Sequence, residues 1–347
     1  MRVILSVLAT IAFLTPGLPA CPAAEPPGPP SLKVVGKHLE TPDGNVKRLR
    51  GVNIPSLEWC QGEHLFESLA VSVDDWGANI IRLPLSQDRW FGRTKERQDE
   101  GAGYRKTVRD FVEKAAAKDC YVILDLHWSG AGVQGQHIGQ HKMPDDGSIE
   151  FWAAVAADYA NHPAILFGLY NEPHDVSWDV WRDGGEVAED FKESKDSPSV
   201  KLEYHTPGLQ KLLDVCRSKG AKNVVIAGGL NWGYDLTGVA KGYTLADPQG
   251  NGVVYDTHLY PWKKDWDRWV TPALDKYPVL VGEFGSDKAD PKAFVAEVVA
   301  YTRKHDLDWT AWCMHPAATP SLIKDWKHTP TAFGEAVREA LRKDAGR

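Results

Sequence analysis

The chain has 347 residues, of which 43% are hydrophobic and 25% charged, and it carries a formal net charge of −7. This length suits one large α/β barrel or two small domains, and the composition is ordinary for a soluble globular protein. Because the chain is mildly acidic and has no basic run, we expect it to bind neither nucleic acid nor an anionic membrane surface. Fourteen tryptophans are many for this length, so we expect some of them to offer flat faces to a ligand.

The first 24 residues have the pattern of an export signal. Arg2 precedes an apolar run at residues 3–14 that has the length of a signal h-region. This run is too short to cross a bilayer, and no other segment is long enough, so we expect no membrane span. We therefore predict a signal peptide over residues 1–24 and an exported protein, secreted or periplasmic. Leu18-Pro19-Ala20-Cys21 also resembles a bacterial lipobox, which makes a lipid anchor at Cys21 the less favoured alternative.

A Pro-rich linker is expected over residues 25–31, followed by one folded domain over residues 32–347. That domain opens with a predicted hairpin over residues 32–49, with its turn at Pro42-Asp43-Gly44-Asn45. After the hairpin, short apolar runs alternate with longer segments of helical periodicity. The apolar runs predict eight strands, at residues 49–53, 79–83, 121–126, 165–169, 223–227, 252–256, 279–283 and 309–312. The helical pattern is clearest at residues 104–118, 151–160, 294–303 and 333–342.

This alternation predicts the fold class. Strands that are apolar almost throughout, and that alternate with helices, indicate a parallel sheet covered by helices. Eight such units in roughly 300 residues fit an α/β fold, a (β/α)8 TIM barrel with a short N-terminal hairpin. Residues 128–148 and 174–199 are predicted to be long loops, and long loops on the functional face of a barrel usually shape the binding cleft.

Polar or aromatic side chains stand at the carboxyl ends of seven of the eight predicted strands. All these ends open on one face of a (β/α)8 barrel, the face where active sites lie. The residues concerned are Asn53, Arg82, His127, Asn171, Glu172, His258, Tyr260, Glu283 and Trp312. Because Glu172 and Glu283 both follow buried strands, we predict chemistry that uses two carboxylates.

These strand ends carry an ordered set of motifs. They are Arg50-Gly51-Val52-Asn53, residues 76–84, Asp125-Leu126-His127, Asn171-Glu172-Pro173, His258-Leu259-Tyr260, Gly282-Glu283-Phe284-Gly285 and Trp312. In this set the chain resembles glycoside hydrolase family 5, of cellulase type, which belongs to a clan of retaining enzymes built on (β/α)8 barrels. The Asn-Glu-Pro tripeptide alone is a weak signal, but the whole set in order, over residues 50–312, is a strong one.

The resemblance implies roles for the two carboxylates and their neighbours. Glu172 resembles the general acid/base and Glu283 the nucleophile of a two-step mechanism, in which the two carboxyl groups stand about 5–5.5 Å apart and a covalent glycosyl-enzyme forms. Arg82 would keep Glu283 ionised by its nearby positive charge. Tyr260 would donate a hydrogen bond to the same carboxylate.

The resemblance also implies how a sugar would be bound. Asn171 would bind the 2-hydroxyl of the reacting sugar, an interaction that strengthens in the transition state. His127 and His258 would bind sugar hydroxyls or tune Glu172. Trp312 would form the platform under the reacting sugar.

The expected activity is that of an O-glycosyl hydrolase acting on a β-linked polysaccharide or oligosaccharide, with β-1,4-glucan cut by endo-hydrolysis as the first choice. A β-mannanase or another β-glucanase, such as one acting on xyloglucan, is the alternative within the same mechanism. A non-catalytic carbohydrate-binding barrel and a transglycosylase rank below both. We expect a monomer. Four tryptophans that follow strands are as consistent with sugar subsites as with packing: Trp59, Trp128, Trp232 and Trp262.

Neither CxxC nor HExxH spacing occurs in the sequence. We therefore expect no metal site and no cofactor, and the two-carboxylate mechanism requires none. Four cysteines would remain after export, and we expect free or partly buried thiols: Cys60, Cys120, Cys216 and Cys313.

Overall fold

The computed structural model describes residues 28–94 and 99–346. The signal peptide expected over residues 1–24, with Cys21, lies outside the described residues, as do residues 25–27 of the expected linker.

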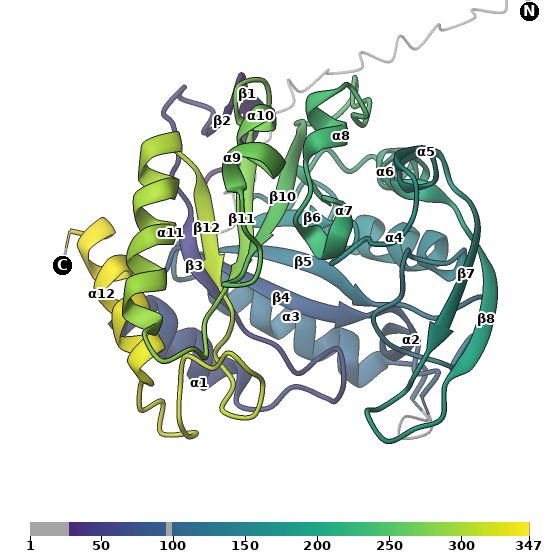
Figure 1. The fold of residues 1–347 in the computed structure, drawn as a ribbon, viewed down its shortest axis with the longest axis horizontal. Coiled ribbons are helices and arrows are strands. Elements are labelled where there is room, and N and C mark those ends of the chain that lie inside the picture. Colours follow the sequence, from purple (N-terminus) through teal and green to yellow (C-terminus); the bar gives the residue numbers. More distant parts are fainter. Residues whose placement is uncertain (1–27, 95–98, 347) are drawn as a thin grey trace, which may run out of the picture.

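Eight parallel strands close into a barrel at the centre of the molecule (Figure 1). Around the barrel the order is β10-β11-β12-β3-β4-β5-β6-β9, which is the order along the chain. The strands are β3 (Arg50–Asn53), β4 (Ile80–Ser86), β5 (Tyr121–Trp128), β6 (Ile165–Gly168), β9 (Val225–Gly228), β10 (Val253–Leu259), β11 (Val279–Phe284) and β12 (Asp308–Ala311). Each overlaps one of the apolar runs, so the predicted (β/α)8 barrel is confirmed.

Helices cover the outside of the barrel, and α11 and α12 lie side by side at the left of Figure 1. In α3, Tyr104, Val108, Phe111 and Val112 share the buried face, because residues three or four apart stand on one side of a helix. The longer helices are α3 (Ala102–Ala116), α4 (Gly147–Asp158), α6 (Gly208–Ser218), α11 (Pro291–His305) and α12 (Ala332–Asp344). The shorter ones are α1 (Leu65–Ala70), the π-helical turn η1 (Val71–Asp75), α2 (Gln87–Trp90), α5 (Trp178–Asp183), α7 (Leu230–Gly233), α8 (Thr237–Ala240), α9 (Trp266–Trp269) and α10 (Thr271–Leu274).

Apolar side chains fill the amino-terminal half of the barrel. They come from the first residues of the strands and form one buried cluster: Ile80, Tyr121, Ile123, Leu166, Ile226, Val254 and Leu280. Leu32 and Leu39, from the N-terminal hairpin, belong to the same cluster. The hairpin therefore closes this end of the barrel, and polar groups gather at the opposite end.

The N-terminal hairpin differs from its prediction in the position of its turn. Strands β1 (Lys33–Val35) and β2 (His38–Glu40) pair with Val35 opposite His38, so the chain reverses at Gly36-Lys37. Gly36 adopts a φ of 59° there, which glycine allows without strain. The predicted turn at Pro42-Asp43-Gly44-Asn45 does form, but only the single Glu40–Val46 bridge follows it.

The second predicted loop, residues 174–199, was the larger error. It contains α5 and the first strand of an antiparallel pair, β7 (Gly185–Phe191) and β8 (Val200–Thr206), at the right edge of Figure 1. Acidic residues interrupt the apolar pattern of β7, which hides the strand in the sequence. Its buried positions, Val187 and Phe191, alternate with exposed ones, so packing on one face stabilises the hairpin.

All four cysteines within residues 28–94 and 99–346 are free, and three of them are buried: Cys120, Cys216 and Cys313. Within the described part of the chain, no helix combines the length and apolar composition needed to cross a membrane.

Candidate active site

Arg82 lies at the centre of the polar end of the barrel, and 2% of it is exposed. Strand register places it opposite Asn53, whose Oδ1 accepts a hydrogen bond from Nη1 at 3.0 Å. Nη1 also donates to Glu283 Oε1 at 2.7 Å, and Nη2 donates to Asn171 Oδ1 at 2.6 Å and pairs with Asp125 at 3.0 Å. Burial alone would lower the pKa of Arg82, but the surrounding carboxylates raise it above its ordinary value. One fixed cation thus holds side chains from four other strands or strand ends.

Glu283 receives a hydrogen bond on each carboxylate oxygen. Arg82 donates to Oε1, and the Tyr260 hydroxyl donates to Oε2 at 2.7 Å. Burial and the charge of Glu283 raise the pKa of Tyr260 well above its usual range, so the hydroxyl keeps its proton. These two donors fix the orientation of the carboxylate.

Glu172 follows β6 and faces Glu283 across the barrel mouth. One oxygen of each carboxylate lies within 4.8 Å of the other. The Glu172 side chain is 20% exposed, whereas Glu283 is almost fully buried. Glu172 is therefore the carboxylate of the pair that is more open to solvent.

His258 lies between carboxylates. A bulge in the pairing of β10 with β11 places His258 beside Glu283. Its Nδ1 lies 2.9 Å from Glu172 Oε1 and 3.6 Å from Glu283 Oε2, and its Nε2 lies 3.3 Å from Asp256. Burial alone would lower the pKa of His258, but Glu283 and Asp256 raise it to about 10.

The contact between His258 and Glu172 also sets the protonation of Glu172 in the free protein. Burial raises the pKa of Glu172, but the hydrogen bond and charge of His258 outweigh burial and lower it. At neutral pH the shared proton therefore resides on His258 Nδ1, and its second proton, on Nε2, faces Asp256.

His127, like His258, is hydrogen-bonded to an aspartate of its own strand. Its Nδ1 lies 2.8 Å from Asp125, and its Nε2 lies 3.3 Å from Asn171 Nδ2. Because the Asn171 amide nitrogen only donates, His127 accepts through Nε2 and carries its proton on Nδ1. Its ring stacks on Trp312, with centroids 5.4 Å apart and planes 10° apart. The nine strand-end residues named in the sequence analysis are thus brought together at one mouth.

Reasoning from the sequence missed Asp125 and Asp256 as partners of the two histidines. Each aspartate stands two positions before its histidine, and alternate residues of a strand point to the same side. That Asp-x-His spacing was a readable signal. Gly282 assists Asp256: its backbone N–H donates to the carboxylate at 2.6 Å, and a Cβ there would approach the carboxylate oxygens to 2.2 Å.

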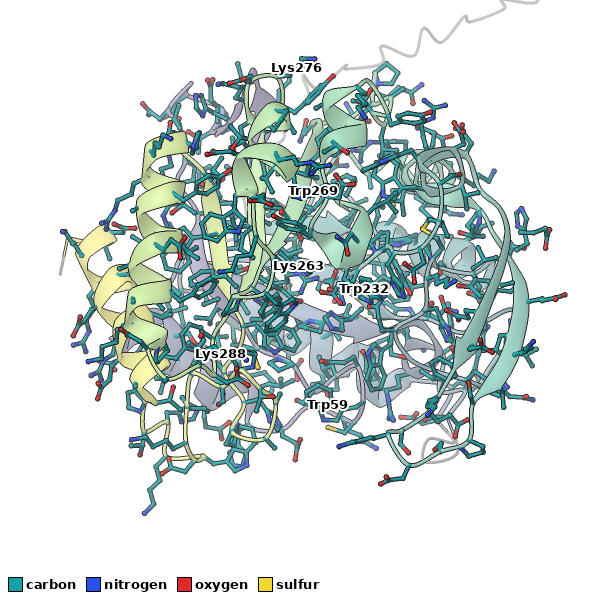
Figure 2. The ribbon with its side chains drawn as sticks, in the orientation of Figure 1. Trp59, Trp232, Lys263, Trp269, Lys276 and Lys288 are labelled. Atoms are coloured by element: carbon teal, nitrogen blue, oxygen red, sulfur yellow. The ribbon has the colours of Figure 1, made fainter. Side chains whose placement is uncertain are left out.

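Two exposed tryptophans lie on the β9–β10 side of the mouth. Trp232 is 40% exposed and stacks on His174, with centroids 4.4 Å apart. Trp262 is 58% exposed and stacks on Tyr260 at 4.8 Å. Figure 2 shows Trp232 near Lys263, whose Nζ lies 5.4 Å from the indole, while Trp59 lies further down the same view.

Trp59 and Trp128, both half-buried, form a second aromatic pair, with centroids 6.3 Å apart. The half-buried indoles leave a partial surface for a ligand, whereas Trp90 and Trp181 are fully buried and pack the core.

Glu172, His258 and Glu283 are close enough together to be tested as a metal site. Their chemistry does not fit one. His258 carries protons on both nitrogens, and both Glu283 oxygens accept hydrogen bonds, so the set offers a cation few free lone pairs.

The fold and the site together define a (β/α)8 barrel with paired carboxylates at its carboxyl-terminal mouth. Residues 40–318 match the family described as Cellulase (glycosyl hydrolase family 5), and the chain therefore belongs to that family.

Curated relatives agree with this assignment. Endoglucanase E-5 of Thermobifida fusca is 24% identical over 293 residues, which cover 81% of this chain and 55% of that protein. An endoglucanase of Paenibacillus polymyxa is 27% identical over 291 residues, which cover 72% of this chain and 70% of that protein. The chain thus spans only about half the length of the T. fusca relative.

Solved structures share the fold. The β-glucanase SdGluc5_26A of Saccharophagus degradans has a TM-score of 0.72 and 22% identity, with 95% of this chain and 98% of that chain covered. The catalytic domain of T. fusca endoglucanase Cel5A has a TM-score of 0.66 and 20% identity, with 90% and 97% covered.

Proposed function

We propose that the chain is a retaining glycoside hydrolase that cleaves β-1,4-linked glucan by endo-hydrolysis. The observation that carries this proposal is the closeness of the two carboxylates, of which one oxygen each lies within 4.8 Å of the other. Retaining enzymes hold the two groups about 5–5.5 Å apart, whereas inverting enzymes hold them about 6.5–9.5 Å apart to admit a water molecule.

In the first step, Glu283 attacks the anomeric carbon while Glu172 protonates the departing glycosidic oxygen. The bond from carbon to that oxygen breaks, and an ester bond to Glu283 forms. Arg82 and Tyr260 orient the attacking carboxylate. In the second step, Glu172 takes a proton from water, the water oxygen attacks the same carbon, and Glu283 is released.

His258 stores the proton that the first step needs. In the free protein this proton lies on Nδ1, 2.9 Å from Glu172. As negative charge grows on the leaving oxygen, the proton passes from Nδ1 to Glu172 and on to that oxygen. Asp256 keeps the Nε2 proton in place, so the imidazole becomes neutral in a defined tautomer.

The remaining site residues position the reacting sugar. Asn171 and His127 offer hydrogen-bonding groups near the carboxylates, and Trp312 offers an aromatic face beside His127. Asn171 contacts the 2-hydroxyl, where a hydrogen bond gains most in the transition state.

The choice of glucan rests on the relatives. Several are named endoglucanases, and a structure of the S. degradans β-glucanase holds cellotetraose. The second candidate is a β-mannanase or another β-glucanase, such as one acting on xyloglucan, because the catalytic groups are common to these activities.

Reducing-sugar release from carboxymethylcellulose, galactomannan and xyloglucan tests the substrate, with Glu283→Gln as the inactive control. We expect carboxymethylcellulose to be cleaved fastest and its viscosity to fall early. Cleavage of galactomannan alone would change the proposed substrate from β-glucan to β-mannan. If Glu283→Gln were as active as the parent, Glu283 would not be the nucleophile. Oligosaccharide products longer than the substrate, formed at high substrate concentration, would indicate transglycosylation.

We also propose that the protein is exported, because residues 1–24 have the pattern of a signal peptide. Mass spectrometry of the mature N-terminus tests this. Cleavage before Cys21 with an added lipid mass would favour the anchored form, and an intact N-terminus would contradict export.

A further inference from the structure

Gln140 connects the long loop after β5 to the catalytic tripeptide. Its Oε1 accepts a hydrogen bond from Asn171 Nδ2 at 2.8 Å. Its Nε2 donates to the backbone carbonyl of Glu172 at 3.1 Å and to that of His141 at 2.8 Å. One half-buried amide thus contacts both the Asn171 side chain and the Glu172 main chain.

The hydrogen-bonding partners of Asn171 and Gln140 allow only one orientation of each side-chain amide. The Arg82 guanidinium can only donate, so the Asn171 atom facing it must be oxygen, and Nδ2 must face Gln140. The carbonyls of Glu172 and His141 can only accept, so Nε2 of Gln140 must face them. The positions of oxygen and nitrogen in the amides of Asn171 and Gln140 are therefore both determined by their partners.

The loop that carries Gln140 is held on both sides. Just before Gln140, Gly139 and Ser129 exchange two backbone hydrogen bonds at 3.0 Å. Just after it, the Tyr170 hydroxyl bonds both the N–H and the carbonyl of His141, at 3.0 and 2.9 Å. The backbone on both sides of Gln140 is therefore held to the ends of β5 and β6.

The β7–β8 hairpin supports the same loop from outside. The His141 imidazole bonds the carboxylate of Glu189, which also accepts the N–H of Lys142 at 3.1 Å. The ring of Phe191 packs on His141 with centroids 4.4 Å apart. Tyr204 bonds the backbone of Met143 at 3.2 and 3.0 Å. The hairpin absent from the sequence prediction thus holds the loop against the active site.

We propose that Gln140 is a positioning residue that fixes the amide of Asn171 for the 2-hydroxyl of the reacting sugar. This inference rests on the proposed function, because it assigns Gln140 an effect through Asn171. Without Gln140, the Asn171 amide keeps only Arg82 and His127 as partners and can rotate away from the sugar. The expected loss is in kcat rather than KM, since the 2-hydroxyl contact strengthens in the transition state.

Gln140→Met tests the positioning role, because methionine keeps the length of the side chain and removes both polar atoms of the amide, Oε1 and Nε2. Against an aryl β-cellobioside we expect kcat to fall about tenfold with KM little changed, the effect of one well-placed hydrogen bond. Against the analogue without the 2-hydroxyl on the sugar that carries the aryl group, we expect no loss relative to the parent. Gln134→Met, at an exposed position of the same loop, is the matched control and should behave as the parent.

Gln140→Glu adds a pH readout that a merely structural role would not produce. A neutral glutamic acid can accept from Asn171 and donate to the Glu172 carbonyl, whereas the ionised form turns a second acceptor towards that carbonyl. The activity of this variant relative to the parent should therefore be highest at acidic pH and fall as the new carboxyl ionises. Gln134→Glu should show a constant ratio.

Two outcomes overturn the inference while the proposed function stands: Gln140→Met as active as the parent, or an equal loss on both aryl substrates. If Gln140→Met lowers the melting temperature, the ratio of rates on the two substrates still decides, because loss of folded enzyme reduces both rates equally. If the parent hydrolysed none of the β-glycans, that result would instead contradict the proposed function itself.

Discussion

His258 lies 2.9 Å from Glu172, and no part of its side chain is exposed. Two further carboxylates, Glu283 and Asp256, face the same ring. This arrangement makes the histidine a cation at neutral pH and leaves Glu172 ionised in the free protein.

The pH dependence of activity should move when His258 is replaced. In the parent, the pair formed by His258 and Glu172 retains its proton up to high pH, because the pKa of His258 is raised to about 10. In His258→Gln, only Glu172 can hold that proton. We expect the basic limb of the kcat/KM profile to shift to lower pH by about one unit or more. A profile with an unchanged basic limb would contradict the proton store.

The same histidine should make stability depend on pH. Its pKa is higher in the folded protein than the ordinary 6.5, so the folded state binds more protons than the unfolded state between pH 6.5 and about 10. This contribution is complete below pH 6.5 and is lost as pH rises through that window. Urea midpoints at pH 6 and pH 9 should therefore differ more for the parent than for His258→Gln. An equal difference in the two proteins would show that His258 is not the group responsible.

Glu172→Ala should separate the two chemical steps. Substrates with poor leaving groups need the acid, and their kcat/KM should fall about 10²–10⁴-fold. Dinitrophenyl glycosides leave without protonation, so the glycosyl-enzyme should form and accumulate. Azide needs no base, so it should restore turnover and give a β-glycosyl azide, which NMR identifies. An α-product, or no effect of azide, would contradict the retaining roles of Glu172 and Glu283.

Arg82→Lys should cost far more than a conservative charge substitution suggests. One ammonium cannot reproduce the fork that reaches Glu283, Asn53, Asn171 and Asp125 together. We expect kcat to fall about a hundredfold or more, the scale seen when a preorganised donor is removed. Steady-state kinetics on carboxymethylcellulose measure this. Parent-like kcat in Arg82→Lys would show that charge alone suffices.

Much of this protein could be read directly from its sequence. Runs such as residues 121–124 and 279–282 are apolar because both faces of a barrel strand are buried, and this pattern predicted the eight strands. Glu172 and Glu283 could be found for the same reason, since a carboxylate that follows a fully buried strand stands at the mouth of the barrel.

Only the tertiary structure decided the rest. The β7–β8 hairpin has its register set by pairing between residues up to 21 positions apart, as for Gly185 and Thr206, and by packing on the loop after β5. No local pattern encodes such contacts. Gln140 was missed for the same reason: in the sequence it is one glutamine in a polar loop, and in space it touches Asn171 and Glu172.

The proton on His258 is likewise a property of the fold. The sequence places His258 two residues after Asp256, but Glu172 and Glu283 come from strands that meet it only when the barrel closes. Hydrophobic periodicity is local and can be read along the chain, whereas a pKa depends on charges brought together from distant segments.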